Sequence, residues 1–202
     1  MGETQSPEEY RARMARKKAI QDARIAQATQ EKGLIIVHTG PGKGKTTAAL
    51  GMVFRALGHG MRIGIVQFIK GARLSGEALF ARELSGRVEF FALGEGFTWE
   101  TQDRERDRAA AERAWDKACA LMADPGYDMV VLDELNIVLR DETLPLGRVL
   151  EALQQKRPAL HVVITGRGAR PELIELADLV TEMKLVKHPF RKGIKAQRGI
   201  EF

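Results

Sequence analysis

The chain is poor in cysteine and in aromatic residues, and these shortages limit what it can be. Cys119 is its one cysteine, so no disulfide can form within the chain, which suits a reducing compartment. No apolar run approaches the roughly 18 residues of a membrane span, and the N-terminal residues lack the apolar core of a secretion signal. The sequence therefore predicts a globular cytoplasmic protein without a membrane segment.

Positive charge exceeds negative charge: 32 Lys and Arg residues stand against 27 Asp and Glu residues, a formal net charge of +5. The basic residues gather at the two ends of the chain, as Arg11, Arg13, Arg16, Lys17 and Lys18 and then as Lys187, Arg191, Lys192, Lys195 and Arg198. Two interpretations stay open, solvated segments or a basic rim around an anionic substrate. Aromatic residues are not interleaved with these charges and no nucleic-acid-binding signature is present, so nucleic acid is not the expected partner.

Residues 1–32 differ from the rest of the chain. Ser6, Pro7 and Glu9 form the pattern of a helix start, with Ser6 as the N-cap and Glu9 closing a capping box. The stretch to about Gln30 suits a helix, but its apolar residues are too widely spaced for a core-facing stripe: Tyr10, Met14, Ile20 and Ile25. We predict either a helix that orders against a partner subunit or a ligand, or a disordered N-terminal extension.

From Gly33 onward the chain alternates between strand-like and helix-like segments, and the apolar run Leu34–His38 is the first strand. Further strands are predicted at Arg62–Ile69, Arg87–Ala92, Met129–Leu132, His161–Thr165 and Leu179–Leu185, and helices at Thr46–Leu57, Asp103–Met122, Leu146–Lys156 and Pro171–Ala177. This alternation predicts a single α/β domain over residues 33–202, of the P-loop, RecA-like type, with a mainly parallel sheet between helices on both faces. Ligands of such sheets bind at the carboxyl ends of the strands.

The first predicted strand runs into a glycine-rich loop, TGPGKGKTT, and a predicted helix follows. A phosphate-binding loop usually reads Gly, any four residues, Gly-Lys and then Ser or Thr. Here Gly44, Lys45 and Thr46 supply the second half, and Thr39 occupies the place of the first glycine. Because backbone N–H groups and a helix N-terminus bind phosphate in such loops, we predict a nucleoside triphosphate site. The predicted ATP contacts in the loop are Thr39, Gly40, Pro41, Gly42, Lys43, Gly44, Lys45, Thr46 and Thr47.

A second group of polar residues follows a later strand, where the apolar run Met129–Leu132 ends in Asp133 and Glu134. One of these carboxylates is expected to hold Mg²⁺, with Mn²⁺ as an alternative; capping of a helix by Asp133 is the competing interpretation. Arg167 follows another predicted strand at the same end of the sheet, where it could reach phosphate or face solvent. The predicted metal ligands are therefore Thr46, Asp133 and Glu134, and Arg167 joins the ATP contacts.

Residues that would hydrolyse ATP are harder to find. Glu134 could position a water molecule against the γ-phosphate, but no second candidate stands out. The histidines are scattered and show no metal-ligand spacing: His38, His59, His161 and His188. A reaction that needs no general base from the protein would explain this pattern.

Six short segments between Gly33 and Phe202 together resemble one known family. They read TGPGKGKTTAALG, VQFIKG, GEGFTWETQD, VVLDELN, VVITGR and HPFRKGIKAQRGIEF. In these segments the chain is similar to the P-loop type of ATP:corrinoid adenosyltransferase, which salvages cobalamin or acts within its synthesis. Residues 1–32 resemble the variable N-terminal region of that family, which covers the active site.

The resemblance implies a particular reaction. Cobalt(I) of a reduced corrinoid attacks C5′ of the ATP ribose, a cobalt–carbon bond forms and triphosphate leaves, so ATP is not hydrolysed. It also implies that ATP lies in a reversed sense on a shortened loop, which accounts for Thr39 in place of glycine. Because cobalt is the nucleophile, no Ser, Cys or His has to be activated. Lys45, Thr46 and Glu134 are the predicted catalytic residues, which hold the reactants in line and neutralise charge on the leaving triphosphate.

The segment GEGFTWETQD places two aromatic residues, Phe97 and Trp99, in a glycine-flanked loop. In the family the matching aromatic residues lie against the corrin and help to displace the lower axial ligand of cobalt(II), which makes its reduction to cobalt(I) easier. The alternative is that the two rings only fill the loop with apolar surface. The chain has no flavin or iron–sulfur motif, so an external electron donor is expected, a reduced flavin or a flavoprotein. A homodimer is expected as well.

Three other functions stay open from the sequence. A P-loop ATPase or kinase of another class would release ADP instead of triphosphate. A RecA-like nucleic-acid motor would show ATPase activity that polynucleotides stimulate and salt suppresses. A non-catalytic corrinoid carrier would bind its ligand without consuming ATP. The sequence also leaves open whether the corrinoid is cobalamin or a biosynthetic precursor such as cobyrinic acid diamide.

Overall fold

The computed structural model describes residues 6–69, 75–84, 86–94 and 103–201, and the chain divides into two compact units, residues 1–32 and 33–202. The first unit contains helix α1 (Pro7–Gln27). Both bonds of the predicted capping box are present: the Glu9 N–H donates to Ser6 Oγ over 3.2 Å, and the Ser6 N–H donates to Glu9 Oε2 over 2.9 Å. No residue of α1 is buried, as its lack of an apolar stripe predicts.

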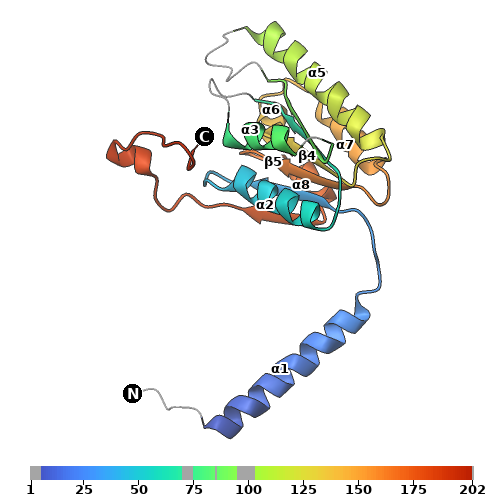
Figure 1. Ribbon diagram of the computed structural model, residues 1–202, viewed down its shortest axis with the longest axis vertical. Coiled ribbons are helices and arrows are strands. Elements are labelled where there is room, and N and C mark those ends of the chain that lie inside the picture. Colours follow the sequence, from blue (N-terminus) through green and yellow to red (C-terminus); the bar gives the residue numbers. More distant parts are fainter. Residues whose placement is uncertain (1–5, 70–74, 85, 95–102, 202) are drawn as a thin grey trace. The chain divides into compact units, whose positions relative to one another are not determined.

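The second unit is built on a sheet of six parallel strands (Figure 1). The strands are β1 (Ile35–Thr39), β2 (Ile63–Gln67), β3 (Val88–Ala92), β4 (Met129–Asp133), β5 (His161–Thr165) and β6 (Leu179–Glu182). Their order across the sheet is β3-β2-β4-β5-β1-β6. β5 therefore lies between β1, which leads into the glycine loop, and β4, which ends in Asp133. Since all strands are parallel, their carboxyl ends meet at one edge of the sheet.

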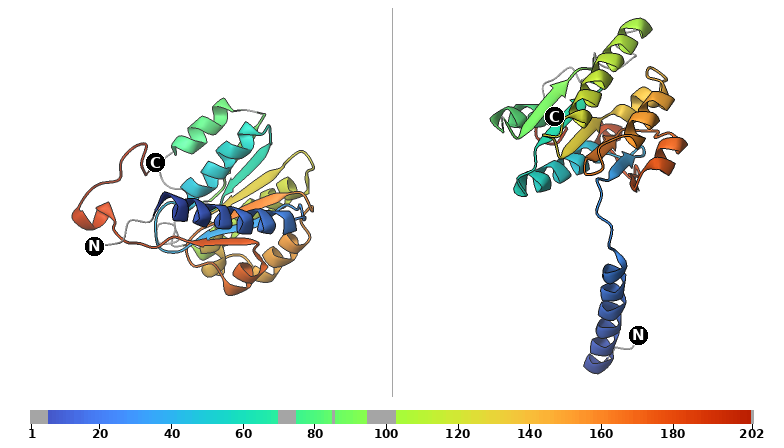
Figure 2. Two further views of the ribbon diagram at one scale, coloured as in Figure 1. Left: turned by 90° about the horizontal axis from the view of Figure 1, so that it is seen from below. Right: turned by 90° about the vertical axis from the view of Figure 1, so that its right-hand side faces the viewer.

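Helices cover both faces of this sheet, as Figures 1 and 2 show. One face carries α2 (Lys45–Gly58) and α3 (Gly76–Glu83), and the other carries α5 (Arg104–Ala123), α6 (Leu135–Arg140), α7 (Leu146–Gln154) and α8 (Pro171–Leu176). A short 3₁₀ helix, η1 (Pro189–Lys192), follows in the C-terminal segment. The predicted α/β fold, a mainly parallel sheet between helices on both faces, is confirmed. In the described part of the chain no helix has the length and apolar character needed to cross a membrane.

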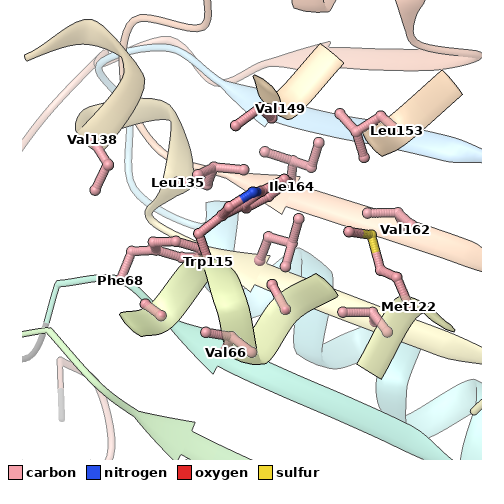
Figure 3. Close-up of a cluster of buried hydrophobic side chains, with 14 of the residues drawn as sticks. Val66, Phe68, Trp115, Met122, Leu135, Val138, Val149, Leu153, Val162 and Ile164 are labelled. Atoms are coloured by element: carbon pink, nitrogen blue, oxygen red, sulfur yellow. The ribbon is translucent and has the colours of Figure 1, made fainter. Parts of the chain in front are cut away.

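Two layers of apolar side chains, one on each face of the sheet, hold these helices in place. Alternate strand residues point to opposite layers: Val37 joins the layer under α5 to α8, whereas Ile36 joins the layer under α2 and α3. Trp115 of α5 is fully buried in the first layer, between the sheet and the neighbouring helices (Figure 3). Ala114 and Ala118, also fully buried on α5, leave room for the helix to approach the strands. This packing fixes the strand ends that carry the polar residues described below.

The structure departs from the predicted elements in two ways. α3 and α6 are absent from the prediction, and α6 has only six residues, too few for its apolar periodicity to stand out. The predicted strands at Arg62–Ile69 and Leu179–Leu185 are shorter in the structure, where β2 ends at Gln67 and β6 ends at Glu182. β6 ends there because the next carbonyl, that of Met183, accepts a hydrogen bond from the glycine loop instead of from a neighbouring strand.

Candidate active site

The glycine loop connects β1 to α2 at the carboxyl edge of the sheet. Gly40 and Gly44 have positive φ angles of 94° and 105°, a conformation that favours glycine. Gly44 is the N-cap of α2 and offers no side chain to cap the helix. The first amides of α2 and the positive end of its dipole therefore face the loop without a competing side chain. Helix N-termini bind anions in this arrangement.

The chain that follows β6 lies directly against this loop. The Met183 N–H donates to the Thr39 carbonyl over 2.9 Å, and the Gly42 N–H donates to the Met183 carbonyl over 2.6 Å. A Cβ atom on Gly42 would come within 2.7 Å of the Met183 and Lys184 carbonyl oxygens. One on Gly40 would come within 2.6 Å of the Met183 oxygen. Close backbone packing thus requires both glycines, and the Gly42 amide is engaged with Met183.

Lys45 begins α2 and turns back onto the loop. Only 6% of Lys45 is exposed, and its Nζ donates to the Gly40 carbonyl over 3.0 Å and to the Gly42 carbonyl over 2.5 Å. Burial lowers the pKa of this ammonium, and the Glu134 carboxylate opposes that shift. The positive charge therefore lies inside the loop.

Asp133, at the end of β4, is the centre of a polar cluster that also includes residues at the ends of β2 and β5 and at the start of α2. Its Oδ1 accepts hydrogen bonds from Thr46 Oγ1 over 2.8 Å and from Thr165 Oγ1 over 2.7 Å, and its Oδ2 accepts one from Gln67 Nε2 over 3.1 Å. Gln67 is the register partner of Asp133 in the sheet, so their side chains leave the same face. The structure thus brings together Thr46 and Asp133, two of the predicted metal ligands, and it is Asp133 that accepts the Thr46 hydroxyl.

Glu134 follows in an unusual backbone conformation, with a φ of 63° that non-glycine residues rarely adopt. Its N–H donates to Thr165 Oγ1 over 2.9 Å, and α6 begins at the next residue. Burial, together with the adjacent Asp133 charge, raises the pKa of the Glu134 carboxyl to about 7. Its Oε2 atom is buried and has no hydrogen-bond partner among the described residues. A buried carboxylate oxygen in this situation is a candidate ligand for a cation.

Thr39 and Arg167 lie in the loops that follow β1 and β5. Thr39 is 8% exposed, and its Oγ1 accepts a hydrogen bond from the Ala169 N–H over 3.1 Å. Thr39, which occupies the place of the first glycine, therefore links the loop after β1 to the loop after β5 by a hydrogen bond. Arg167 is exposed, and its charge adds to the effect of burial in lowering the pKa of Lys45. Arg167 is thus within electrostatic range of the loop, with its guanidinium open to solvent.

The remaining predicted contacts lie on the outer side of the loop or outside the described residues. Pro41, Lys43 and Thr47 are exposed. Lys43 forms an ion pair with Glu201, near the C-terminal end of the chain, which the sequence does not predict. Phe97 and Trp99 lie outside the described residues, so their contact with a corrinoid stays a prediction.

Three further residues of this site escape the sequence prediction: Gln67, Thr165 and Asn136. Gln67 and Thr165 are polar residues at the ends of apolar strands, and this same signal, which identified Asp133, could have found them. Asn136 is fully buried in α6, and its Nδ2 donates to the Gly166 carbonyl over 3.0 Å, which fixes the loop after β5. A single amide within a short helix gives no comparable signal.

Comparison with known proteins decides to which P-loop family this site belongs. The family model described as ATP:corrinoid adenosyltransferase BtuR/CobO/CobP matches residues 31–202. The chain belongs to the ATP:corrinoid adenosyltransferase family. A second family model, described as Cob(I)alamin adenosyltransferase N terminal, matches residues 1–25. The similarity to this adenosyltransferase family seen in the six sequence segments is thereby confirmed.

Relatives along nearly the whole chain support the same assignment. A corrinoid adenosyltransferase of Pseudomonas aeruginosa is 58% identical over 201 residues, which cover 98% of this chain and 99% of the relative. A corrinoid adenosyltransferase of Sinorhizobium sp. is 56% identical over 192 residues, covering 94% of this chain and 90% of the relative. The Escherichia coli K12 corrinoid adenosyltransferase is 49% identical over 197 residues, covering 98% and 100%. Adenosyltransferase relatives do not favour the alternative of an ATPase or kinase of another class.

Proposed function

We propose that the chain transfers the 5′-deoxyadenosyl group of ATP to cobalt(I) of a reduced corrinoid and releases triphosphate. The observation that carries this proposal is the glycine loop joined to Asp133 through Thr46, in a member of the adenosyltransferase family. Cobalt(I) supplies the electron pair for the new cobalt–carbon bond, and triphosphate leaves with the electrons of the broken C5′–O bond. The protein then has to hold the two reactants in line, and no side chain has to act as nucleophile or base.

Lys45 is the proposed counter-charge for the leaving triphosphate. In the structure its ammonium donates to the Gly40 and Gly42 carbonyls inside the loop. Phosphate oxygens are stronger acceptors than neutral carbonyls because they are charged, so a bound triphosphate would take over some of these bonds. Lys43 and Arg167 extend the positive surface on the exposed side of the loop. Fixed cations of this kind stabilise negative charge as it develops on a leaving group.

Thr46, Asp133 and Glu134 fit a hard divalent cation such as Mg²⁺, with Mn²⁺ as an alternative. All three side chains end in oxygen, and Glu134 Oε2 has no hydrogen-bond partner among the described residues. The described part of the chain contains no group of three or more His, Cys, Asp or Glu residues that could hold a metal ion by themselves. Phosphate oxygens and water would then complete the coordination, as is usual for Mg²⁺. Bound there, Mg²⁺ would supply positive charge next to the triphosphate oxygens.

The remaining parts of the proposal concern the second substrate and the partners. We propose that the corrinoid lies against Phe97 and Trp99 and that a reduced flavin or a flavoprotein supplies the electron. We also propose a homodimer in which residues 1–32 cover an active site. α1 buries none of its own residues, which supports a helix that acts by binding elsewhere. The lone cysteine supports a reducing, cytoplasmic location.

Anaerobic product analysis tests this function. The protein is mixed with MgATP and chemically reduced cobalamin, or with reduced cobyrinic acid diamide, and the visible spectrum and the phosphate products are followed. We expect the spectrum of an adenosylcorrinoid and one triphosphate for each adenosyl group transferred. ADP in place of triphosphate would identify an ATPase or kinase, and corrinoid binding without consumption of ATP would identify a carrier.

Glu134→Ala is expected to raise the Mg²⁺ concentration for half-maximal turnover by about tenfold, because the loss of one carboxylate near a bound cation weakens its affinity. Affinity for the corrinoid should change much less. Titration of turnover with Mg²⁺ measures the effect, and Glu175→Ala, which removes an exposed carboxylate on α8, is the matched control. If the wild-type and Glu134→Ala titrations overlay, Glu134 is not close to the metal and Asp133 becomes the candidate.

The stability of the nucleotide-free chain is expected to depend on pH through Glu134. The pKa of its carboxyl is about 7 in the folded chain, against an ordinary value of 4.5. The stability that this raised pKa contributes is therefore fully present when the pH is below the ordinary pKa of 4.5. It is lost as the pH rises through the folded-state pKa of about 7. Glu134→Gln does not ionise, so its free energy of unfolding should gain on that of the wild type between pH 5 and pH 8. Urea unfolding at both pH values measures this, and a difference independent of pH would contradict it.

A further inference from the structure

The C-terminal segment after β6 contacts the glycine loop at two points. The first is the pair of backbone bonds between Met183 and the loop residues Thr39 and Gly42. The second is the ion pair between Lys43 Nζ and Glu201 Oε2. Between these points the chain runs outward through η1 and returns toward the loop, as the red segment of Figure 1 shows. The loop is thus held from both ends of the same segment.

Glu201 is placed for this contact by its own local structure. Its backbone N–H donates to the Gln197 carbonyl over 2.9 Å, which closes a turn just before the end of the chain. The Glu201 side chain is 17% exposed, whereas the Lys43 side chain is 48% exposed. The carboxylate is therefore largely covered where it meets the loop, and the lysine keeps a free side toward solvent. All residues from Pro189 to Ile200 are exposed, so within the described part of the returning chain Glu201 is the residue that is partly buried.

Under the proposed function, on which this inference rests, Glu201 and the triphosphate chain compete for Lys43. Lys43 belongs to the loop that is proposed to hold the triphosphate chain, and a phosphate oxygen would compete with Glu201 for the same ammonium. A polyphosphate beside Lys43 also places negative charge next to the Glu201 carboxylate, and the two repel each other. Product triphosphate, which is highly charged, has to leave such a loop after each turnover.

We propose that Glu201 is a tethered competitor that exchanges with triphosphate on Lys43 and thereby speeds release of the product. Because Glu201 is on the same chain as Lys43, its effective concentration at the ammonium is high without any added anion. When triphosphate is bound, Lys43 turns to it and the C-terminal segment is released. When triphosphate leaves, Glu201 returns to Lys43. Glu201 touches no substrate in this scheme; it acts through Lys43, as a positioning residue.

The size of the effect follows from the kind of interaction. An ion pair between partly exposed side chains contributes modestly, so its loss should change affinity by no more than about fivefold. Glu201→Gln keeps the shape of the side chain and removes its charge. We expect this variant to bind inorganic triphosphate about threefold more tightly than the wild type and to release it more slowly.

Calorimetric titration of the full chain with inorganic triphosphate and Mg²⁺, without corrinoid, tests the proposal. Four proteins are compared: wild type, Glu201→Gln, Lys43→Met and the double variant. We expect Glu201→Gln to tighten triphosphate binding when Lys43 is present and to change it little when Lys43 is replaced by Met. This pattern would establish that the two residues act through each other. Glu172→Gln, an exposed carboxylate on α8, is the control for a general change of charge.

Trypsin gives a second readout that a structural role would not produce. The exposed segment carries the cleavage sites Arg191, Lys192, Lys195 and Arg198. Triphosphate should speed cleavage there in the wild type, and Glu201→Gln should be cleaved fast with or without it. Unchanged or weaker triphosphate binding by Glu201→Gln, or an equal effect with and without Lys43, would overturn the proposal. If the wild type bound neither triphosphate nor ATP, the phosphate-binding loop and the proposed function would fail first.

Discussion

Lys45→Met should lower the rate of adenosylation by about a hundredfold or more. The ammonium lies inside the glycine loop, at the N-terminus of α2, and the variant removes the charge while keeping a side chain of similar length. Loss of one fixed group that stabilises a developing negative charge typically costs about two to three orders of magnitude in rate. Single-turnover mixing of the protein with MgATP and cobalt(I) corrinoid measures the chemical step, and a triphosphate titration separates it from binding.

The same variant should also be less stable, because Lys45 is buried rather than exposed. Its Nζ donates to two loop carbonyls, and methionine leaves those acceptors without a donor. Leaving a buried polar group without its partner costs about 1–3 kcal/mol of folding free energy. Lys43→Met is the matched control, since it makes the same change on the exposed side of the loop, and its effects on rate and stability should be smaller. A folded Lys45→Met protein with near-normal turnover would contradict the phosphate assignment.

Replacing Phe97 or Trp99 with Ala should slow the reaction from cobalt(II) at least about tenfold more than the reaction from preformed cobalt(I). The reason is the proposed displacement of the lower axial ligand, which matters only while cobalt(II) is being reduced. A tenfold gap corresponds to about 1.4 kcal/mol of lost stabilisation. Two assays on each variant measure this, one from cobalt(II) with a reduced flavin and one from cobalt(I) made beforehand. ATP affinity should hardly change, since neither residue belongs to the glycine loop.

Phe54→Ala is a suitable control for this comparison. Phe54 is an aromatic residue on α2 that is 76% exposed, and its loss should affect both assays equally or not at all. Equal losses from cobalt(II) and cobalt(I) in the Phe97 and Trp99 variants would mean that the two rings fill the loop or bind the corrin without acting on its axial ligand. The transfer reaction would then rest on the glycine loop and the family assignment.

The fold and the centre of the site could be predicted because their signals are local. Apolar strands such as Met129–Leu132 end in a polar residue at the carboxyl edge, so the parallel topology alone brings Asp133 toward the glycine loop. The capping box of Ser6 and Glu9 is likewise a short-range pattern with one physical meaning. In each case neighbouring residues in the sequence determine the structure.

The rest could not be predicted because it depends on contacts between distant parts of the chain. The sequence predicts Gly42 as a phosphate contact. The structure adds a second reason for glycine there, because a Cβ atom would collide with the Met183 and Lys184 carbonyl oxygens. The pairing of Lys43 with Glu201 joins residues 158 positions apart. The burial of Lys45 and the raised pKa of Glu134 follow from the same close packing around the loop. No local pattern in the sequence carries this information.

Transfer of isotope from ATP to cobalt is a direct test of the proposed adenosyl transfer. ATP labelled with ¹³C at C5′ is mixed anaerobically with the protein, Mg²⁺ and cobalt(I) corrinoid, and the product is examined by carbon NMR. We expect the labelled carbon to become bonded to cobalt while unlabelled inorganic triphosphate appears in equal amount. Label that remains in ADP or in unchanged ATP, with no cobalt-bound carbon, would contradict it.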